Sequence, residues 1–220
     1  MDELAKSIQE KYIDDLTSRY PLHRFFMLFI VVFFMLNYDS GNTNIYEILS
    51  KTSIKEVFDF KDGFLAKLTI IQLLLALVIV YFLSITYKKI NAILFIKLTK
   101  LHNFENYTSN VTKKYEMAKR NDAYDFFIVK EIDRKIEAKK IELRAKFITA
   151  EICMTLLICI LWEGILPPIN TLVILLLLLS FFTLQWKMFK FYIVHFFPLY
   201  VAKNYLLNEE ITFENGFKDC

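Results

Sequence analysis

Hydrophobic and polar positions along this chain fall into long blocks. Four blocks are apolar enough to cross a bilayer as a helix, which takes about 20 residues. They cover residues 22–38, 64–87, 147–166 and 167–186. Pro167 and Pro168 stand between the last two blocks, and proline interrupts a helix. The pattern therefore predicts four membrane-spanning helices, of which the last two form a tight hairpin.

A long polar segment, residues 88–146, lies between the second and third apolar blocks. Residues 88–101 continue the helical pattern of the second span, and the polar stretch HNFENYTSN at 102–110 predicts a reversal of the chain. From residue 111 the helical pattern returns, and an apolar stripe runs through Val129, Ile132, Ile136, Leu143 and Phe147. We predict a long helical hairpin, here called the arm.

The second helix of this hairpin passes directly into the third span. The stretch KIELRAKFITAEICMTLLICILW, residues 140–162, changes from charged to apolar without a Gly or Pro. Glu131 with Lys135 and Glu142 with Lys146 are spaced as i,i+4 ion pairs of an exposed helix face. We predict one uninterrupted helix of about 40 residues, or ~60 Å.

The two ends of the chain are amphipathic. Residues 1–21 predict a helix with one apolar face that packs on the arm: Leu4, Ile8, Tyr12, Leu16 and Tyr20. Residues 187–220 predict a helix in the membrane interface, bent at Pro198, followed by a polar tail. A fifth span over residues 188–202 is the alternative.

Composition and charge place these segments. The chain is 55% hydrophobic with 22 Phe, yet 23% of it is charged, so apolar and charged segments are separate. Lys and Arg concentrate in the arm and beside the first and last spans, whereas loop 39–63 carries more acids than bases. Basic loops stay in the cytoplasm. We expect an all-α, multi-pass four-helix bundle of the bacterial inner membrane, with both termini and the arm cytoplasmic.

The basic residues of the arm are the candidate partner-binding residues. They are Lys113, Lys114, Lys119, Arg120, Arg134, Lys135, Lys139, Lys140 and Arg144. One interpretation is that they dock a soluble cytoplasmic protein or a second copy of the chain. The other is that they hold the arm to anionic lipid. Nucleic acid is not an expected partner, because acidic residues are interleaved throughout.

Three polar residues within the spans are candidates for a pore or for contacts between helices. They are Gln72, Glu151 and Glu163. Ionisable groups at membrane depth often serve a function. Glu151 is expected to pair with Lys146 or with another span, Gln72 to hydrogen-bond between helices, and Glu163 to face water.

Chemical motifs are lacking. His23, His102 and His195 are scattered, without a carboxylate or Cys at ligand spacing, and Cys153 and Cys159 lie in an apolar run. No hydrolase, zinc-protease or P-loop motif occurs. We expect no catalytic residue, no metal and no cofactor, and hence no enzyme.

Four spans, short external loops and a composition rich in Lys, Ile, Phe and Asn resemble two groups of small bacterial inner-membrane proteins. One is the membrane subunit of two-component anti-phage systems such as Kiwa, where a membrane oligomer holds a soluble cytoplasmic effector. The other is the immunity protein of pore-forming colicins. The resemblance covers the whole chain as topology and involves no motif, so no functional residue carries over.

The length of the arm favours the first resemblance, because it offers a soluble partner a place to bind. We therefore expect a homo-oligomeric membrane scaffold or sensor that docks a cytoplasmic effector in anti-phage defence. A pore-forming or membrane-depolarising effector and an immunity protein against a bacteriocin are the alternatives.

Overall fold

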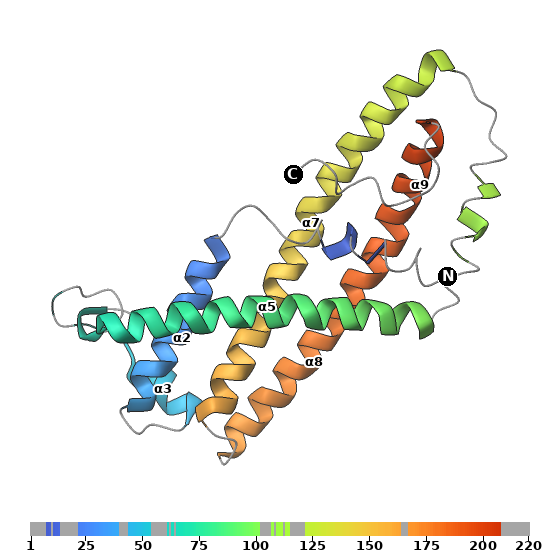
Figure 1. Ribbon diagram of the computed structural model, residues 1–220. Helices are drawn as coiled ribbons and strands as arrows, with labels where there is room; N and C mark the ends of the chain where they lie inside the picture. The colour runs from blue at the N-terminus through green and yellow to red at the C-terminus, as the bar shows by residue number, and fades with distance from the viewer. Residues whose placement is uncertain are drawn as a thin grey trace. The chain divides into compact units, whose positions relative to one another are not determined.

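The computed structural model is mostly helical over the residues that it describes, with no strand among them (Figure 1). These are residues 8–9, 11–13, 22–39, 44–53, 61, 63, 65–101, 107, 109–111, 113–114, 122–163 and 167–207. The all-α prediction is confirmed for this part of the chain.

Three helices are long and apolar enough to cross a membrane, over Ile70–Lys100, Ile128–Trp162 and Pro168–Leu206. They belong to α5 (Ile70–Leu101), α7 (Asp122–Glu163) and α8 (Pro168–Phe191) with its continuation. The first predicted span is α2 (Leu22–Asp39), whose described apolar part, His23–Asn37, is shorter. The chain thus has the helices of a membrane protein, and the fourth crossing remains a prediction.

Helix α7 confirms the predicted uninterrupted helix. It runs for 42 residues with no break where the sequence changes from charged to apolar, and Figure 1 shows it as one ribbon. Helix α5 likewise continues beyond Tyr87 to Leu101, as predicted. Ala, Leu, Glu, Lys and Arg dominate the charged half of α7, and all are strong helix formers.

The helix of the second predicted span begins at Ile70, after the first residues of that span. Helix α5 starts at Ile70 rather than near Phe64, after a short 3-10 turn η1 (Leu65–Lys67). Thr69 and Gln72 explain this boundary. The Thr69 hydroxyl accepts from the Gln72 backbone N–H at 3.2 Å, while the Thr69 backbone N–H donates to Gln72 Oε1 at 3.0 Å. This reciprocal pair is a capping box, which satisfies donors at a helix start.

The helix of the last predicted span continues past Trp186. Helix α8 continues to Phe191, passes through a π-helical turn η2 (Tyr192–Phe196) and leads into α9 (Phe197–Leu206). Pro198 accounts for the π turn, because proline has no N–H and crowds the preceding turn. The Phe197 N–H donates to Tyr192 O, five residues earlier. The next bond of this series would join residue 198 to Ile193 O, but Pro198 has no N–H to donate. The Tyr107 hydroxyl donates to that oxygen at 3.4 Å.

The loop between the first two spans contains a helix that the sequence pattern did not predict, α3 (Ile45–Lys51). Asn44 Oδ1 accepts from the Tyr46 backbone N–H at 3.0 Å. Asn170 Oδ1, near the start of α8, accepts from the Ile45 backbone N–H at 3.1 Å. Asn170, which is fully buried, thus caps α3 although it is distant from that helix in the sequence.

Contacts divide the chain into two compact units. Unit 1 comprises Met1–Ser18, Lys88–Phe147 and Leu184–Cys220, and unit 2 comprises Arg19–Tyr87 and Ile148–Thr183. Helices α5, α7 and α8 each contribute to both units. On α5 and α7, the division falls where the sequence changes between apolar and charged.

Unit 1 has an aromatic core. Tyr12 stacks on Phe95 of α5 with ring centroids 4.7 Å apart, and meets Tyr192 edge-on at 4.9 Å. Phe95 in turn contacts Phe189 at 5.4 Å. Tyr12 and Ile8 are both buried. The described part of the N-terminal helix therefore packs on the arm as predicted, while Leu4, Leu16 and Tyr20 lie outside the described residues.

The charged half of α7 packs into unit 1 through the predicted stripe. Ile132, Ile136, Leu143 and Phe147 are buried, and Val129 is half-buried. On the outer side, the Lys135–Glu131 and Lys146–Glu142 pairs form at 4.0 and 2.7 Å. A salt bridge of 2.8 Å from Lys203 to Asp133 links α9 to α7.

Unit 2 exposes apolar side chains. Along α5 and α8 these include Ile70, Ile71, Leu74, Val78, Leu172, Leu175, Leu179 and Phe182. Soluble proteins rarely expose apolar surface of this extent, whereas lipid accommodates it. Such exposed faces are typical of helices that meet acyl chains.

Replacement of Tyr12 by Ala is expected to destabilise unit 1 by about 3 kcal/mol, because a buried aromatic ring is lost. Faster hydrogen exchange over residues 91–99 and 192–200 of the detergent-solubilised protein would measure the change. Gln9→Ala, on the same short helix, is the control and should leave exchange unchanged. Equal effects of both changes would contradict the assigned core.

Burial raises the pKa of the Tyr12 hydroxyl, because the phenolate would lose its hydration. The unfolded chain ionises this group near pH 10. The contribution of Tyr12 to stability is therefore complete below that pH and declines as the pH rises above it. We expect Tyr12→Phe to reduce the fall in melting temperature between about pH 9 and 11. Tyr46→Phe, at an exposed site, should not reduce it.

Candidate functional site

A cluster of three polar side chains joins three helices inside unit 2. The Ser84 hydroxyl of α5 donates to Glu151 Oε1 of α7 at 2.6 Å. The other carboxylate oxygen, Oε2, lies 3.0 Å from His23 Nε2 of α2. Glu151 is only 2% exposed and Ser84 6%. We call His23, Ser84 and Glu151 the polar cluster.

Helical spacing brings Ser84 and Glu151 together. Buried positions on α5 follow one face of the helix: Ala76, Val80, Leu83, Ser84 and Tyr87. The buried positions of α7 do the same around Phe147, Ala150, Glu151, Met154 and Thr155. Each polar residue therefore sits within an apolar stripe, and the two stripes pack with Ser84 against Glu151.

The order of contacts determines what the cluster can do chemically. In a Ser-His-acid triad the imidazole stands between hydroxyl and carboxylate and takes the hydroxyl proton. Here the Glu151 carboxyl stands between Ser84 and His23, so the imidazole does not receive the Ser84 proton. The arrangement is suited to holding the three helices together.

Sequence spacing had left His23 without a partner, and the structure corrects this. Its carboxylate partner lies 128 positions away in the chain. The imidazole Nδ1 is buried and has no hydrogen-bond partner among the residues that the structure describes. Nothing in the local sequence signals the contact; only the packing of α2 on α7 creates it.

Of the two partners expected for Glu151, the residue on another span is the one observed. Lys146 instead bonds Glu142 at 2.7 Å and lies 4.1 Å from the Phe191 ring centroid. The hydrogen bond from Lys146 lowers the pKa of the Glu142 carboxyl. Glu151 is therefore turned into unit 2, away from the charged half of α7.

The other two intramembrane candidates differ from Glu151. Gln72 uses its carbonyl oxygen in the capping box with Thr69, so its first role is to begin α5. Glu163 is the last residue of α7, and its side chain lies outside the described part of the structure. The structure does not bring Gln72 to the polar cluster.

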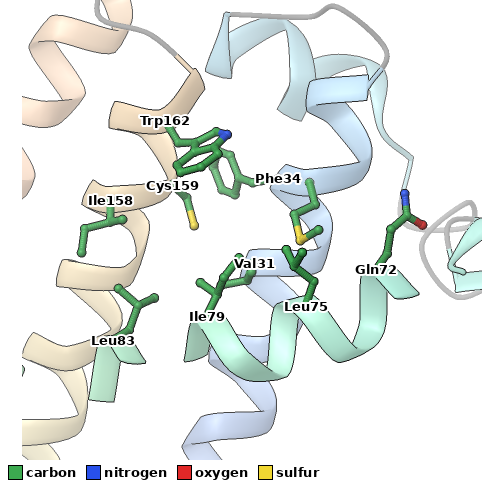
Figure 2. A pocket seen from close by; sticks show the side chains of 10 residues that line it. Val31, Phe34, Gln72, Leu75, Ile79, Leu83, Ile158, Cys159 and Trp162 are labelled. Atoms are coloured by element: carbon green, nitrogen blue, oxygen red, sulfur yellow. The ribbon is translucent and has the colours of Figure 1, made fainter. Parts of the chain in front are cut away.

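An apolar pocket of about 350 Å³ lies between α2, α5 and α7 in unit 2. Its lining consists of Val31, Phe34, Met35, Gln72, Leu75, Ile79, Leu83, Ile158, Cys159 and Trp162. Figure 2 shows side chains of the three helices converging on it, with Gln72 at the edge. No charged residue lines the pocket, so it suits a hydrocarbon group.

A second pocket, of about 320 Å³, lies between α2 and α5 beside the polar cluster. It is lined by Arg24, Phe25, Leu28, Leu77, Val80, Tyr81 and Ser84. Unlike the first, it combines a charged residue with apolar ones. We call it the Arg24 pocket.

The candidate partner-binding residues fall into different environments. Lys113, Lys114, Arg134 and Lys135 are exposed, while Lys139, Lys140 and Arg144 are half-buried. Several are paired within the chain, with Lys140 2.9 Å from Glu137 and Lys139 3.5 Å from Glu142. Lys119 and Arg120 lie outside the described residues. Much of the predicted basic surface is therefore neutralised locally.

Metal ligands do not gather in the described part of the chain, where no group of three His, Cys, Asp or Glu residues is placed to hold an ion. His195 is exposed and lies against the Phe191 ring at 4.7 Å. His102 lies outside the described residues.

No protein-family model, curated protein or solved structure matches this chain. The function is therefore inferred from the geometry of the chain itself.

A double-mutant cycle tests the polar cluster. We expect Ser84→Ala and Glu151→Gln to be coupled by roughly 0.5–2 kcal/mol, the range for hydrogen bonds between membrane helices. Unfolding of the detergent-solubilised protein by sodium dodecyl sulfate measures this coupling.

Thr183→Ala combined with Glu151→Gln is the control pair. The exposed Thr183 hydroxyl bonds within its own helix, to Ser180 O at 2.9 Å, so its coupling should be near zero. Additive effects of Ser84→Ala and Glu151→Gln would refute the observed contact.

Proposed function

We propose that this protein is a membrane-anchored scaffold that docks a soluble cytoplasmic protein on unit 1. One observation carries the proposal. Three helices of membrane length, α5, α7 and α8, extend without interruption from unit 2 into a separately packed unit 1. A protein that acted wholly within the bilayer would have no need of that second unit.

The lengths of the helices support the assignment of unit 1 to the aqueous side. The hydrocarbon core is about 30 Å thick. At 1.5 Å per residue, α5 is ~48 Å long and α7 ~63 Å. The charge-free part of α5, residues 70–87, accounts for ~27 Å. Roughly half of α7 therefore extends beyond the lipid.

Charge supports the orientation that we propose. Lys and Arg are abundant in unit 1 segments of α5 and α7, whereas α5 and α8 carry no charge over residues 70–87 and 168–186. Basic segments are retained in the cytoplasm. Unit 1 and both termini are then cytoplasmic, and α2 completes a four-helix bundle with the three long helices in the inner membrane.

The docking surface that we propose lies on the outer face of α7, around Ile141. This side chain is 70% exposed in a segment that is otherwise charged. Arg134, Ala138 and Ala145 are exposed within about 60° of it at 100° per residue. An apolar centre with a polar rim is the anatomy of a protein interface.

An ion pair lies at the edge of this surface. Glu137, about 40° around α7 from Ile141, pairs with Lys140 at 2.9 Å. The surface therefore presents both signs of charge, which favours a folded protein with an apolar pocket over a uniformly anionic ligand. Among the predicted basic residues, Arg134 is the one that lies closest to Ile141 around the helix.

The biological setting that we propose is bacterial anti-phage defence, with the scaffold as a homo-oligomer. It is supported by the resemblance in topology to Kiwa-like membrane subunits and by the packed unit 1, which gives an effector a preformed surface. The compact packing of unit 1 lowers the entropy lost on docking.

Ile141→Asp is expected to abolish the stoichiometric co-purification of a soluble protein with the tagged chain from its native membranes. A charge at the centre of an apolar interface costs about 2 kcal/mol or more, which lowers affinity at least about thirtyfold. Quantitative mass spectrometry of the purified complex measures the ratio of partner to scaffold.

Ile128→Asp is the matched control, since Ile128 is also exposed, at 43%, but lies about 140° away around α7. It should retain the partner. Loss of partner in both variants, or in neither, would refute the docking surface. A pure homo-oligomer that conducts ions in planar bilayers would favour the pore-forming alternative, and a lone monomer the immunity alternative.

A further inference from the structure

The Arg24 pocket has a charged end and an apolar end. Arg24 and Ser84 line one end, and Leu28 and Leu77 line the other. The charged and apolar residues separate in this way because α2 and α5 run in opposite directions. The start of α2 meets the Ser84 turn of α5, while Phe34 and Met35, further along α2, share a pocket with Gln72 and Leu75.

The charged end lies at the edge of the charge-free segment of α5. Ser84 is one turn before Lys88, the first basic residue after residues 70–87. That segment is ~27 Å long, close to the thickness of the hydrocarbon core. Arg24 and Ser84 are therefore at the depth of lipid headgroups, and Leu28 and Leu77 are at the depth of acyl chains.

Arg24 is a cation with no partner among the residues that the structure describes. It is exposed, and it makes no ion pair or hydrogen bond with any residue that the structure describes. Guanidinium groups at a membrane surface bind phosphate, often through two parallel hydrogen bonds. The uncompensated charge favours a lipid whose own net charge is negative.

Ser84 adds a second requirement. Its hydroxyl proton is donated to the Glu151 carboxylate at 2.6 Å, so the Ser84 oxygen can only accept. The part of a lipid headgroup that lies beside the Ser84 oxygen must therefore be a hydrogen-bond donor. A phosphoglycerol headgroup meets both requirements, with its phosphate on Arg24 and a donor hydroxyl toward Ser84. The glycerol hydroxyls donate, and the phosphate retains its charge.

We infer that the Arg24 pocket binds one anionic phospholipid of the phosphatidylglycerol class. Arg24 holds the phosphate, Ser84 accepts from the headgroup hydroxyl, and an acyl chain lies along Leu28, Leu77 and Val80. Because Ser84 is also bonded to Glu151, the lipid is adjacent to the polar cluster that joins α2, α5 and α7. This inference does not depend on the docking surface of α7.

Native mass spectrometry of the delipidated full-length protein, titrated with phosphatidylglycerol or phosphatidylcholine, tests the site. One phosphatidylglycerol should bind at least about tenfold more tightly than phosphatidylcholine, since a charge-assisted contact is gained. Arg24→Gln should remove about tenfold of that affinity, and Arg24→Lys should restore part of it. Leu77→Trp should weaken binding by filling the pocket.

Lys89→Gln is the matched control. Lys89 is an exposed cation at nearly the same depth on α5 and does not line the pocket. It should change phosphatidylglycerol affinity less than about twofold. Equal affinity for the two lipids would overturn the inference. So would an equal effect of Lys89→Gln and Arg24→Gln, or unaltered binding by a monodisperse, helical Leu77→Trp variant.

Discussion

The carboxyl group of Glu151 is the constraint on which the membrane-embedded architecture depends. A charged or polar group deep in an apolar unit is costly unless it is hydrogen-bonded. Ser84 and His23 meet this need from two other helices, with one contact to each carboxylate oxygen. Leucine faces are interchangeable against lipid, so apolar packing alone specifies register weakly in a membrane. The polar cluster supplies a specific alignment of α2, α5 and α7, and Glu151 and Ser84 are buried there, at 2% and 6% exposure.

The second constraint is length. Helices α5, α7 and α8 with its continuation exceed the thickness of a bilayer, so each must leave it. In the topology that we propose, unit 1 lies outside lipid, where the hydrophobic effect again favours burial, and the rings around Tyr12, Phe95 and Tyr192 pack together. The same helix thus follows two packing rules. Apolar side chains face outward along much of unit 2, whereas in unit 1 most are buried, and Ile141, at 70%, is the most exposed large hydrophobic side chain described there.

The polar cluster and the Arg24 pocket share Ser84, so the two sites of unit 2 are linked through one hydroxyl group. Because the Ser84 hydroxyl donates to Glu151, its oxygen offers the pocket an acceptor beside the Arg24 cation. A lipid in the pocket would donate a hydrogen bond to the Ser84 hydroxyl, whose orientation is already determined by its contact with Glu151. The lipid site and the α7 surface lie in different units, so the proposed anchoring and docking use separate parts of the chain.

The sequence by itself determined the helical class, the unbroken 42-residue α7, the continuation of α5 to Leu101 and the buried stripe from Ile132 to Phe147. These follow from periodicity, and periodicity is local. It also singled out Glu151 as exceptional, but not its partners. His23 and Ser84 become a site only when three helices pack, and Asn170 becomes the cap of α3 only across 125 positions. Likewise, the continuation of α8 past Trp186 depends on a π turn that accommodates Pro198. Such contacts depend on distances in space, which the order of residues along one helix does not contain.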